Sequence, residues 1–113
     1  MTKYHNIKKT VDGIKFDSKA EAERYVELKL MQRAGHISGL QLQPEFELIP
    51  RYKKNGKTVR KTVYIADFMY TDNYTDETVI EDVKGVKTAV YKLKKKLFEY
   101  RYPQYTITEV IKK

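Results

Sequence analysis

The sequence has 113 residues, 41% of them hydrophobic, which suffices for one folded domain with a real core and argues against a chain that is disordered throughout. Lysine and arginine number 23 against 15 aspartates and glutamates, a formal charge of +8, and so basic a domain favours a polyanionic partner. The absence of cysteine excludes disulfides, thiolate metal sites and cysteine nucleophiles, and no apolar run approaches the roughly 18 residues of a membrane helix.

We therefore expect a single domain over residues 1–113 without a membrane partner. No apolar stretch follows residues 1–6, so we expect no secretory signal. The lack of cysteine agrees with a reducing compartment, and we expect a cytoplasmic protein.

The N-terminal third of the sequence predicts a hairpin followed by a helix. Residues 7–11 and 14–16 are expected to pair as strands, because Asp12-Gly13 supplies the positive φ angles of a tight type I′ turn. Ser18-Lys19-Ala20-Glu21 is a capping box, which predicts a helix that begins at Ser18 and stops near Gly35.

The remaining elements alternate between strands and one further helix. In chain order we expect a strand over 40–49 ended by Pro50, a basic connection over 51–61 with a turn at Asn55-Gly56, a strand over 62–70, a polar turn over 71–77, a strand over 78–84 ended by Gly85, a helix over 88–101 stopped by Pro103, and a strand over 105–111. Helical spacing places Val90, Leu93, Leu97 and Tyr100 on one apolar stripe of the second helix, the pattern of a helix that packs one side against a core.

After the hairpin, the predicted order is helix, three strands, helix, strand. Two helices that alternate with one mixed sheet indicate an α/β layered domain.

The third of these strands carries candidate catalytic residues in the segment Ile80-Glu81-Asp82-Val83-Lys84. Because side chains alternate faces along a strand, Asp82 and Lys84 are expected on one face, and Glu81 and Val83 on the other. The preceding strand carries Asp67 between apolar neighbours, where an acid is costly to bury without a partner. A short turn joins the two strands, so we expect them to pair antiparallel and to bring Asp67 beside Asp82.

Two carboxylates in close proximity repel each other unless a proton or a cation lies between them. Their oxygen atoms suit Mg²⁺, which one or two carboxylates and a substrate phosphate commonly hold.

Asp67, followed after a hairpin by Asp82-Val83-Lys84, resembles the signature of the PD-(D/E)XK (restriction-endonuclease-like) nuclease superfamily, and the predicted order of elements matches its αβββαβ core. Ala66 stands where the signature has Pro, and Asp82 stands where Glu is commoner. The resemblance to a group of small phage-encoded members extends over nearly the whole chain, through Phe16-Asp17-Ser18-Lys19-Ala20-Glu21-Ala22, Leu42-Gln43-Pro44, Ala66-Asp67-Phe68 and Glu81-Asp82-Val83-Lys84-Gly85.

This resemblance implies a mixed sheet flanked by helices and a catalytic centre formed by Asp67, Asp82 and Lys84. The two acids would hold Mg²⁺, for which Mn²⁺ can substitute, with help from the Val83 carbonyl, and Lys84 would orient the attacking water and offset charge on the phosphate. For a phage-encoded member the compartment would be the cytoplasm of the bacterial host.

Three further positions are weaker site candidates. The superfamily often adds an acid from the first helix, which makes Glu21 a candidate metal ligand, although a capping-box Glu needs no other role; Glu23 is the alternative. Gln43 matches a polar position of the phage group and could contact phosphate or a metal-bound water.

Two basic runs are candidate DNA-binding surfaces, since phosphate contacts position DNA without reading its sequence. One comprises Arg51, Lys53, Lys54, Lys57, Arg60 and Lys61, and the other Lys84, Lys87, Lys92, Lys94, Lys95 and Lys96.

The function expected from these features is that of a Mg²⁺-dependent DNA endonuclease that acts on no small molecule. A homodimeric resolvase of branched DNA and a single-strand or flap nuclease are equally compatible with the sequence. The alternative is a catalytically inactive, nucleic-acid-binding accessory protein on the same fold, in which Asp67, Asp82 and Lys84 form a structural ion-pair network. An RNA target also stays open.

Overall fold

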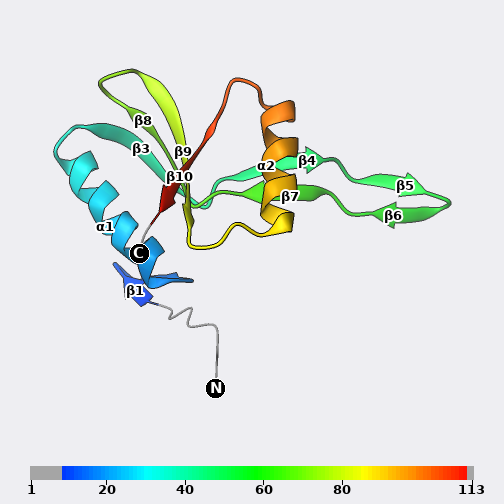
Figure 1. Cartoon of the computed structure of the whole chain (residues 1–113), viewed down its shortest axis with the longest axis horizontal. Coiled ribbons are helices and arrows are strands. Elements are labelled where there is room, and N and C mark those ends of the chain that lie inside the picture. Colours follow the sequence, from blue (N-terminus) through cyan, green and yellow to red (C-terminus); the bar gives the residue numbers. More distant parts are fainter. Residues whose placement is uncertain (1–8, 112–113) are drawn as a thin grey trace.

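A computed structural model of the chain describes residues 9–111, which form an α/β domain (Figure 1). The elements in chain order are β1 (Lys9–Val11), β2 (Ile14–Phe16), α1 (Lys19–Arg33), β3 (Ile37–Leu42), β4 (Glu45–Ile49), β5 (Tyr52–Lys54), β6 (Lys57–Val59), β7 (Thr62–Ile65), β8 (Phe68–Asp72), β9 (Glu77–Lys84), α2 (Ala89–Arg101) and β10 (Ile107–Ile111). Within the described residues, no helix is long and apolar enough to cross a membrane.

A four-stranded mixed sheet lies at the centre of the domain. Its order is β10-β9-β8-β3, with β8 antiparallel to both β3 and β9, and β10 parallel to β9. The helices and the strands of this sheet follow one another as helix, three strands, helix, strand. The expected α/β class and mixed sheet are thereby confirmed.

The predicted turn and cap of the N-terminal segment are present. Asp12 and Gly13 adopt φ angles of 53° and 75° between β1 and β2, as a type I′ turn requires. The Ser18 side chain caps α1 by accepting a hydrogen bond from the Glu21 backbone N–H at 3.1 Å. Residues 7 and 8, where the hairpin was expected to begin, lie outside the described residues.

The strands expected over 40–49 and 62–70 are each divided in two, which corrects the sequence prediction. The first divides at Gln43-Pro44, where Gln43 has a φ of 50°, and the second at residues 66–67. Each chain segment leaves the central sheet at its break and continues in a separate ribbon, β4 paired with β7. The breaks face each other, because the Gln43 N–H donates to the Asp67 carbonyl at 2.9 Å and the Ala66 N–H to the Pro44 carbonyl at 3.1 Å.

Each face of the central sheet carries a hydrophobic core. One core lies under α1 and the N-terminal hairpin, and it contains Phe16, Ala22, Tyr25, Leu28, Ile37, Phe68 and Tyr70. The other lies between α2, the β4–β7 ribbon and β9–β10, and it contains Leu48, Tyr64, Ala66, Ile80, Tyr91, Phe98 and Ile107. Neighbouring residues of β9 therefore point into different surroundings, Ile80 toward α2 and Val79 toward α1.

Most of the apolar stripe expected to bury α2 faces the outside. Val90, Leu93 and Tyr100 are 64%, 57% and 87% exposed, whereas Tyr91 and Phe98 are buried. Of the stripe, Leu97 packs against the core. The aromatic pair occupies the space between the ribbon and the sheet, where Phe98 contacts Phe46 at 4.9 Å between ring centroids. The side of this helix that packs inward is therefore the one that buries the large aromatic side chains.

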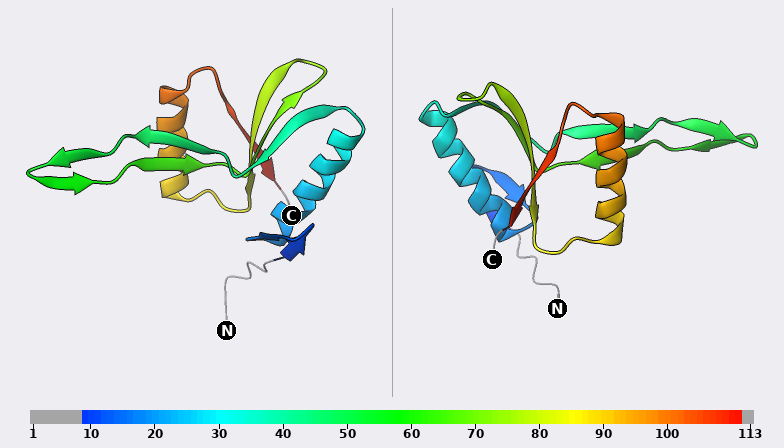
Figure 2. Two further views of the ribbon diagram at one scale, coloured as in Figure 1. Left: turned by 180° about the vertical axis from the view of Figure 1, so that it is seen from behind. Right: turned by 45° about the horizontal axis from the view of Figure 1, so that its top comes forward.

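Residues 51–61 project from the body of the domain, and we call this segment the arm. It was expected to be a basic connection and contains the short strands β5 and β6, which pair with each other around the predicted Asn55-Gly56 turn. All three views show it as an extension of the β4–β7 ribbon beyond α2 (Figures 1 and 2).

Candidate active site

The candidate site lies where β8 separates from β9. Phe68, the first residue of β8, pairs with Glu81 of β9, and the N–H of Asp67 just before it donates to the Glu81 carbonyl at 3.0 Å. The chain reaches this point from β7, outside the central sheet, and the Val83 N–H donates to the Asp67 carboxylate at 2.6 Å. The separation of the strands thus fixes Asp67 beside the end of β9.

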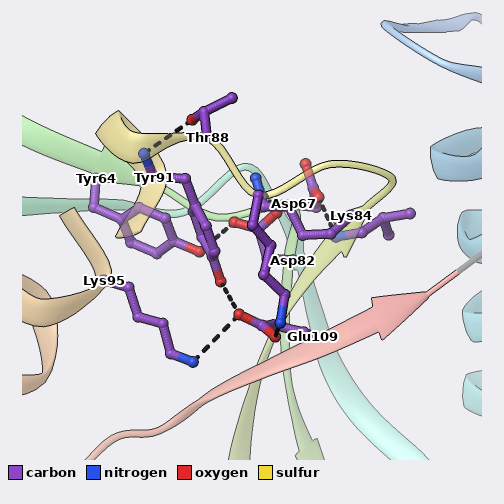
Figure 3. Close-up of polar contacts among 10 residues, drawn as sticks. Tyr64, Asp67, Asp82, Lys84, Thr88, Tyr91, Lys95 and Glu109 are labelled. Carbon is purple, nitrogen blue, oxygen red and sulfur yellow. Dashed lines mark hydrogen bonds and ion pairs between the residues drawn. The ribbon is translucent and has the colours of Figure 1, made fainter. Parts of the chain in front are cut away.

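Asp82 is buried on the face of β9 that looks toward α2. Its carboxylate accepts a hydrogen bond from the Tyr64 hydroxyl at 2.5 Å and an ion pair from Lys84 at 2.9 Å (Figure 3). The Lys84 ammonium also lies 3.9 Å from the centre of the Tyr91 ring, a cation–π geometry. Asp82 and Lys84 therefore share one face of the strand, as alternation predicted.

Glu81 points to the opposite face, also as predicted. It is 1% exposed, and Arg24 of α1 donates two hydrogen bonds to its carboxylate at 2.8 and 2.6 Å. The Tyr70 hydroxyl donates a third. These partners compensate the buried charge and leave Glu81 outside the Asp82 site.

The first turn of α1 brings Glu21 to the site from the other side. Its carboxyl group forms a side-chain hydrogen bond with Asp67, whereas Glu23 is exposed. Burial, followed by the charges of Glu21 and Asp82, raises the pKa of Asp67 to about 8, although the Val83 N–H opposes this shift. Burial likewise raises the pKa of Glu21, and the charge of Asp82 adds to the effect. The three acids therefore interact electrostatically.

Two pockets meet at Lys84. One of about 270 Å³ lies toward α2 and is lined by Val63, Tyr64, Ile65, Asp82, Lys84, Thr88, Val90, Tyr91 and Lys94. The other, of about 290 Å³, lies toward α1 and is lined by Asp17, Ser18, Ala20, Glu21, Val83, Lys84 and Gly85. Lys84 thus lines both pockets, with Asp82 in the first and Glu21 in the second.

The donor set suits a hard divalent cation in its chemistry, since it offers several carboxylate oxygens, and the charges of Glu21 and Asp82 raise the pKa of Asp67. The side chains are not gathered into a coordination shell. Among residues 9–111, no three Asp, Glu, His or Cys side chains are grouped as a metal site. Asp82 is engaged by Tyr64 and Lys84, so these contacts would have to rearrange for a cation to be held.

A family model described as "Protein of unknown function (DUF1064)" matches residues 1–113, the whole of the chain. The chain belongs to the DUF1064 family. No curated protein and no solved structure matches it.

Three residues of this DUF1064 domain that support the site were not singled out from the sequence. Tyr64 holds Asp82, and Tyr91 lies under Lys84 while its hydroxyl donates to Glu109 of β10 at 2.8 Å (Figure 3). Tyr91 is buried. Its burial depends on β10, which pairs with β9 from the far end of the chain, so local sequence carries no signal for it.

Glu109 also changes the basic surface expected along α2. It forms ion pairs with Lys87 at 2.8 Å and Lys95 at 3.2 Å, and these partners lower its pKa to about 2. Lys92 and Lys96 remain exposed, and Lys94 lines the pocket beside Asp82.

Gln43 lies at the bend between β3 and β4, with its backbone N–H on the Asp67 carbonyl and its side chain exposed. The structure thus brings it next to the segment that carries Asp67.

Proposed function

We propose that this DUF1064 protein is a Mg²⁺-dependent DNA endonuclease with a PD-(D/E)XK catalytic centre. The observation that carries the proposal is the convergence of Glu21, Asp67, Asp82 and Lys84 from three segments of the chain. Glu21 contacts Asp67, Asp67 binds the N–H of the residue after Asp82, and Asp82 pairs with Lys84. Acids and a lysine at one point on a basic domain suit the hydrolysis of a phosphodiester.

The fold supports the same proposal. The central sheet with its helices has the element order of the restriction-endonuclease-like αβββαβ core, including a parallel final pair, β9 with β10.

In the proposed mechanism, Asp67, Asp82 and Glu21 would hold the cation, with Mn²⁺ as an alternative to Mg²⁺. When bound there, the cation would supply Lewis-acid polarisation of the phosphate and would acidify a water molecule. Lys84 offsets negative charge that develops on the phosphate, and Tyr91 positions its ammonium group through the cation–π contact. Lys94, which lines the same pocket, provides a further cation for the neighbouring phosphate.

The test is a cleavage panel of linear, nicked, flapped, single-stranded and four-way DNA, with a matched RNA, in the presence of Mg²⁺ or Mn²⁺. We expect the wild-type protein to cut DNA, and Asp67→Asn, Asp82→Asn and Lys84→Ala to lower the rate by two orders of magnitude or more, about 3 kcal/mol of barrier. Circular dichroism would establish that each variant is folded. Cleavage of the four-way substrate by a dimer would support the resolvase form of the proposal.

Glu21→Gln and Glu23→Gln form a matched pair on one helix. Only the first is next to Asp67, so the first should slow cleavage and the second should not. Glu81→Gln is a poor control for this purpose, because it disrupts the buried contact with Arg24.

The accessory-protein alternative has an observation of its own. Lys84 already neutralises Asp82, and Glu21 shares a hydrogen bond with Asp67, so the network is satisfied without substrate. If purified wild-type protein binds DNA but cuts no member of the panel with either metal, the accessory role replaces the nuclease.

A further inference from the structure

The arm carries a dense and unbalanced charge. Five of the ten residues from 51 to 60 are lysine or arginine, and none is acidic: Arg51, Lys53, Lys54, Lys57 and Arg60. All five are exposed, and within the described part of the chain none is within ion-pair distance of an acid. The next cation, Lys61, pairs with Glu45 at 3.2 Å. Such a segment repels itself unless an anionic partner neutralises it.

The arm also lacks support from the rest of the domain. Among the described elements, β5 and β6 make extensive contacts only with each other. The seven consecutive residues 52–58, which include the turn, are all exposed. An isolated two-stranded hairpin is marginally stable in water and gains stability from packing on something else. The charge of the arm indicates that its packing partner is a polyanion.

The strand register distributes the cations over both sides of the arm. Lys54 pairs directly with Lys57, so their side chains share one face. Lys53 pairs with Thr58 and points to the other face, because neighbouring residues alternate. A flat anionic surface would contact the cations on only one face of the arm. A groove with phosphates on both walls would contact the cations on both faces. The major groove of B-form DNA admits a two-stranded ribbon, and the deep, narrow major groove of A-form RNA does not.

The length of the arm sets its reach. Twelve residues separate Asn55 at the tip from Asp67 at the site, and at about 3.3 Å per strand residue they span at most about 40 Å. The views show the ribbon running away from the site without folding back (Figures 1 and 2). One turn of B-form DNA is about 34–36 Å.

We propose that the arm lies in the major groove of duplex DNA about one helical turn from Asp67, and so favours DNA that is duplex on the side of the arm. The proposal rests on the proposed function only in taking DNA as the partner. It requires no cleavage, and its test is a binding measurement in the presence of a chelator.

The first experiment compares affinities for a duplex of about 30 base pairs, close to three turns, and for one of its strands. The triple variant Lys53→Gln/Lys54→Gln/Lys57→Gln should lose at least about tenfold in duplex affinity, and its log–log salt slope should become less steep by about 2.7 if all three lysines contact phosphate. Its single-strand affinity should change little. The control Lys9→Gln/Lys15→Gln/Lys29→Gln removes equal charge from the β1–β2 hairpin and α1, and should leave duplex affinity within about threefold.

The second experiment locates the arm by dimethyl sulfate footprinting, which reports on guanine N7 in the major groove. Wild-type protein should protect guanines about one turn from the centre of the hydroxyl-radical footprint. The arm variant should lose this guanine protection and keep the rest of the footprint. Equal losses for the arm variant and the control, or unchanged N7 reactivity, would overturn the proposal. Protection by a protein that cuts no DNA would overturn the nuclease and leave the arm standing.

Discussion

Asp67 lies in an environment that penalises its negative charge. In the native protein its carboxyl group lies against the Val83 N–H and the Glu21 carboxyl, with Asp82 close enough to add repulsion. Burial, and then the charges of Glu21 and Asp82, raise the pKa of Asp67 to about 8. A proton on Asp67 would relieve this repulsion. The arrangement stores an electrostatic cost that a bound cation would remove.

This cost predicts a dependence of stability on pH. The pKa of Asp67 is 3.8 as an ordinary value and about 8 when folded, so between these pH values the native state keeps a proton that the unfolded chain has lost. The free energy of unfolding should therefore fall as pH rises through this window and level off above it. Urea denaturation with chelator at about pH 5 and about pH 8 measures the fall.

Asp67→Asn should reduce this loss of stability, because the amide keeps a hydrogen-bonding group at the same place without the charge. In the comparison between variant and wild type, titrating groups that the substitution does not affect contribute equally to the pH dependence of stability, so their contributions cancel. A variant that loses as much stability as wild type between the two pH values would contradict the raised pKa of Asp67.

At the scale of elements, one buried ion pair joins α1 to the central sheet. Arg24 bridges Glu81 of β9 and Glu27 of its own helix, and the pKa of Arg24 is raised, chiefly by the hydrogen bonds to Glu81. This contact holds the helix that carries Glu21 against the strand that carries Asp82. The pair therefore positions two parts of the candidate site relative to each other.

Arg24→Met should lower the free energy of unfolding by about 3–5 kcal/mol, because it leaves the Glu81 charge buried with only the Tyr70 hydroxyl as a partner. The double variant Arg24→Met/Glu81→Gln should lose less than the single one, since no uncompensated charge remains. Chemical denaturation of the four proteins completes the cycle. Additive losses would indicate that the pair contributes no coupling.

At the scale of the whole molecule, metal binding should appear as added stability. A cation that binds only the native state stabilises it by mass action, by about 1.4 kcal/mol at a free concentration tenfold above Kd. For a domain of this size that corresponds to a rise of about 5 °C in Tm. Thermal unfolding with millimolar Mn²⁺ against chelator measures the shift.

Asp67→Ala should abolish this rise and serves as the control for the site. If the variant gains as much stability from Mn²⁺ as the wild type, the metal binds elsewhere. Mn²⁺ without effect on the wild type would remove the metal from the proposed mechanism.

Features that depend on neighbours along the chain could be predicted from the sequence. Asp12-Gly13 and Asn55-Gly56 predicted tight turns, Ser18 predicted a cap, and all three formed as expected. Alternation along 80–84 correctly separated Glu81 from Asp82 and Lys84. These outcomes rest on local backbone preferences and on the two-residue period of a strand, which distant contacts did not override.

Other features depend on contacts between segments that are distant in the sequence, and they became known only from the tertiary structure. The breaks at Gln43-Pro44 and Asp67 became visible only when the two bends met across the sheet, because each segment alone is apolar enough to be one long strand. The side of α2 that packs inward is the one that carries Phe98, which joins an aromatic cluster. Helical periodicity predicted the side with Leu93 instead, because it takes no account of partners from other elements. The partners of the site, Tyr64, Tyr91 and Glu109, come from three separate elements, and only the packing of those elements brings them to Asp82 and Lys84.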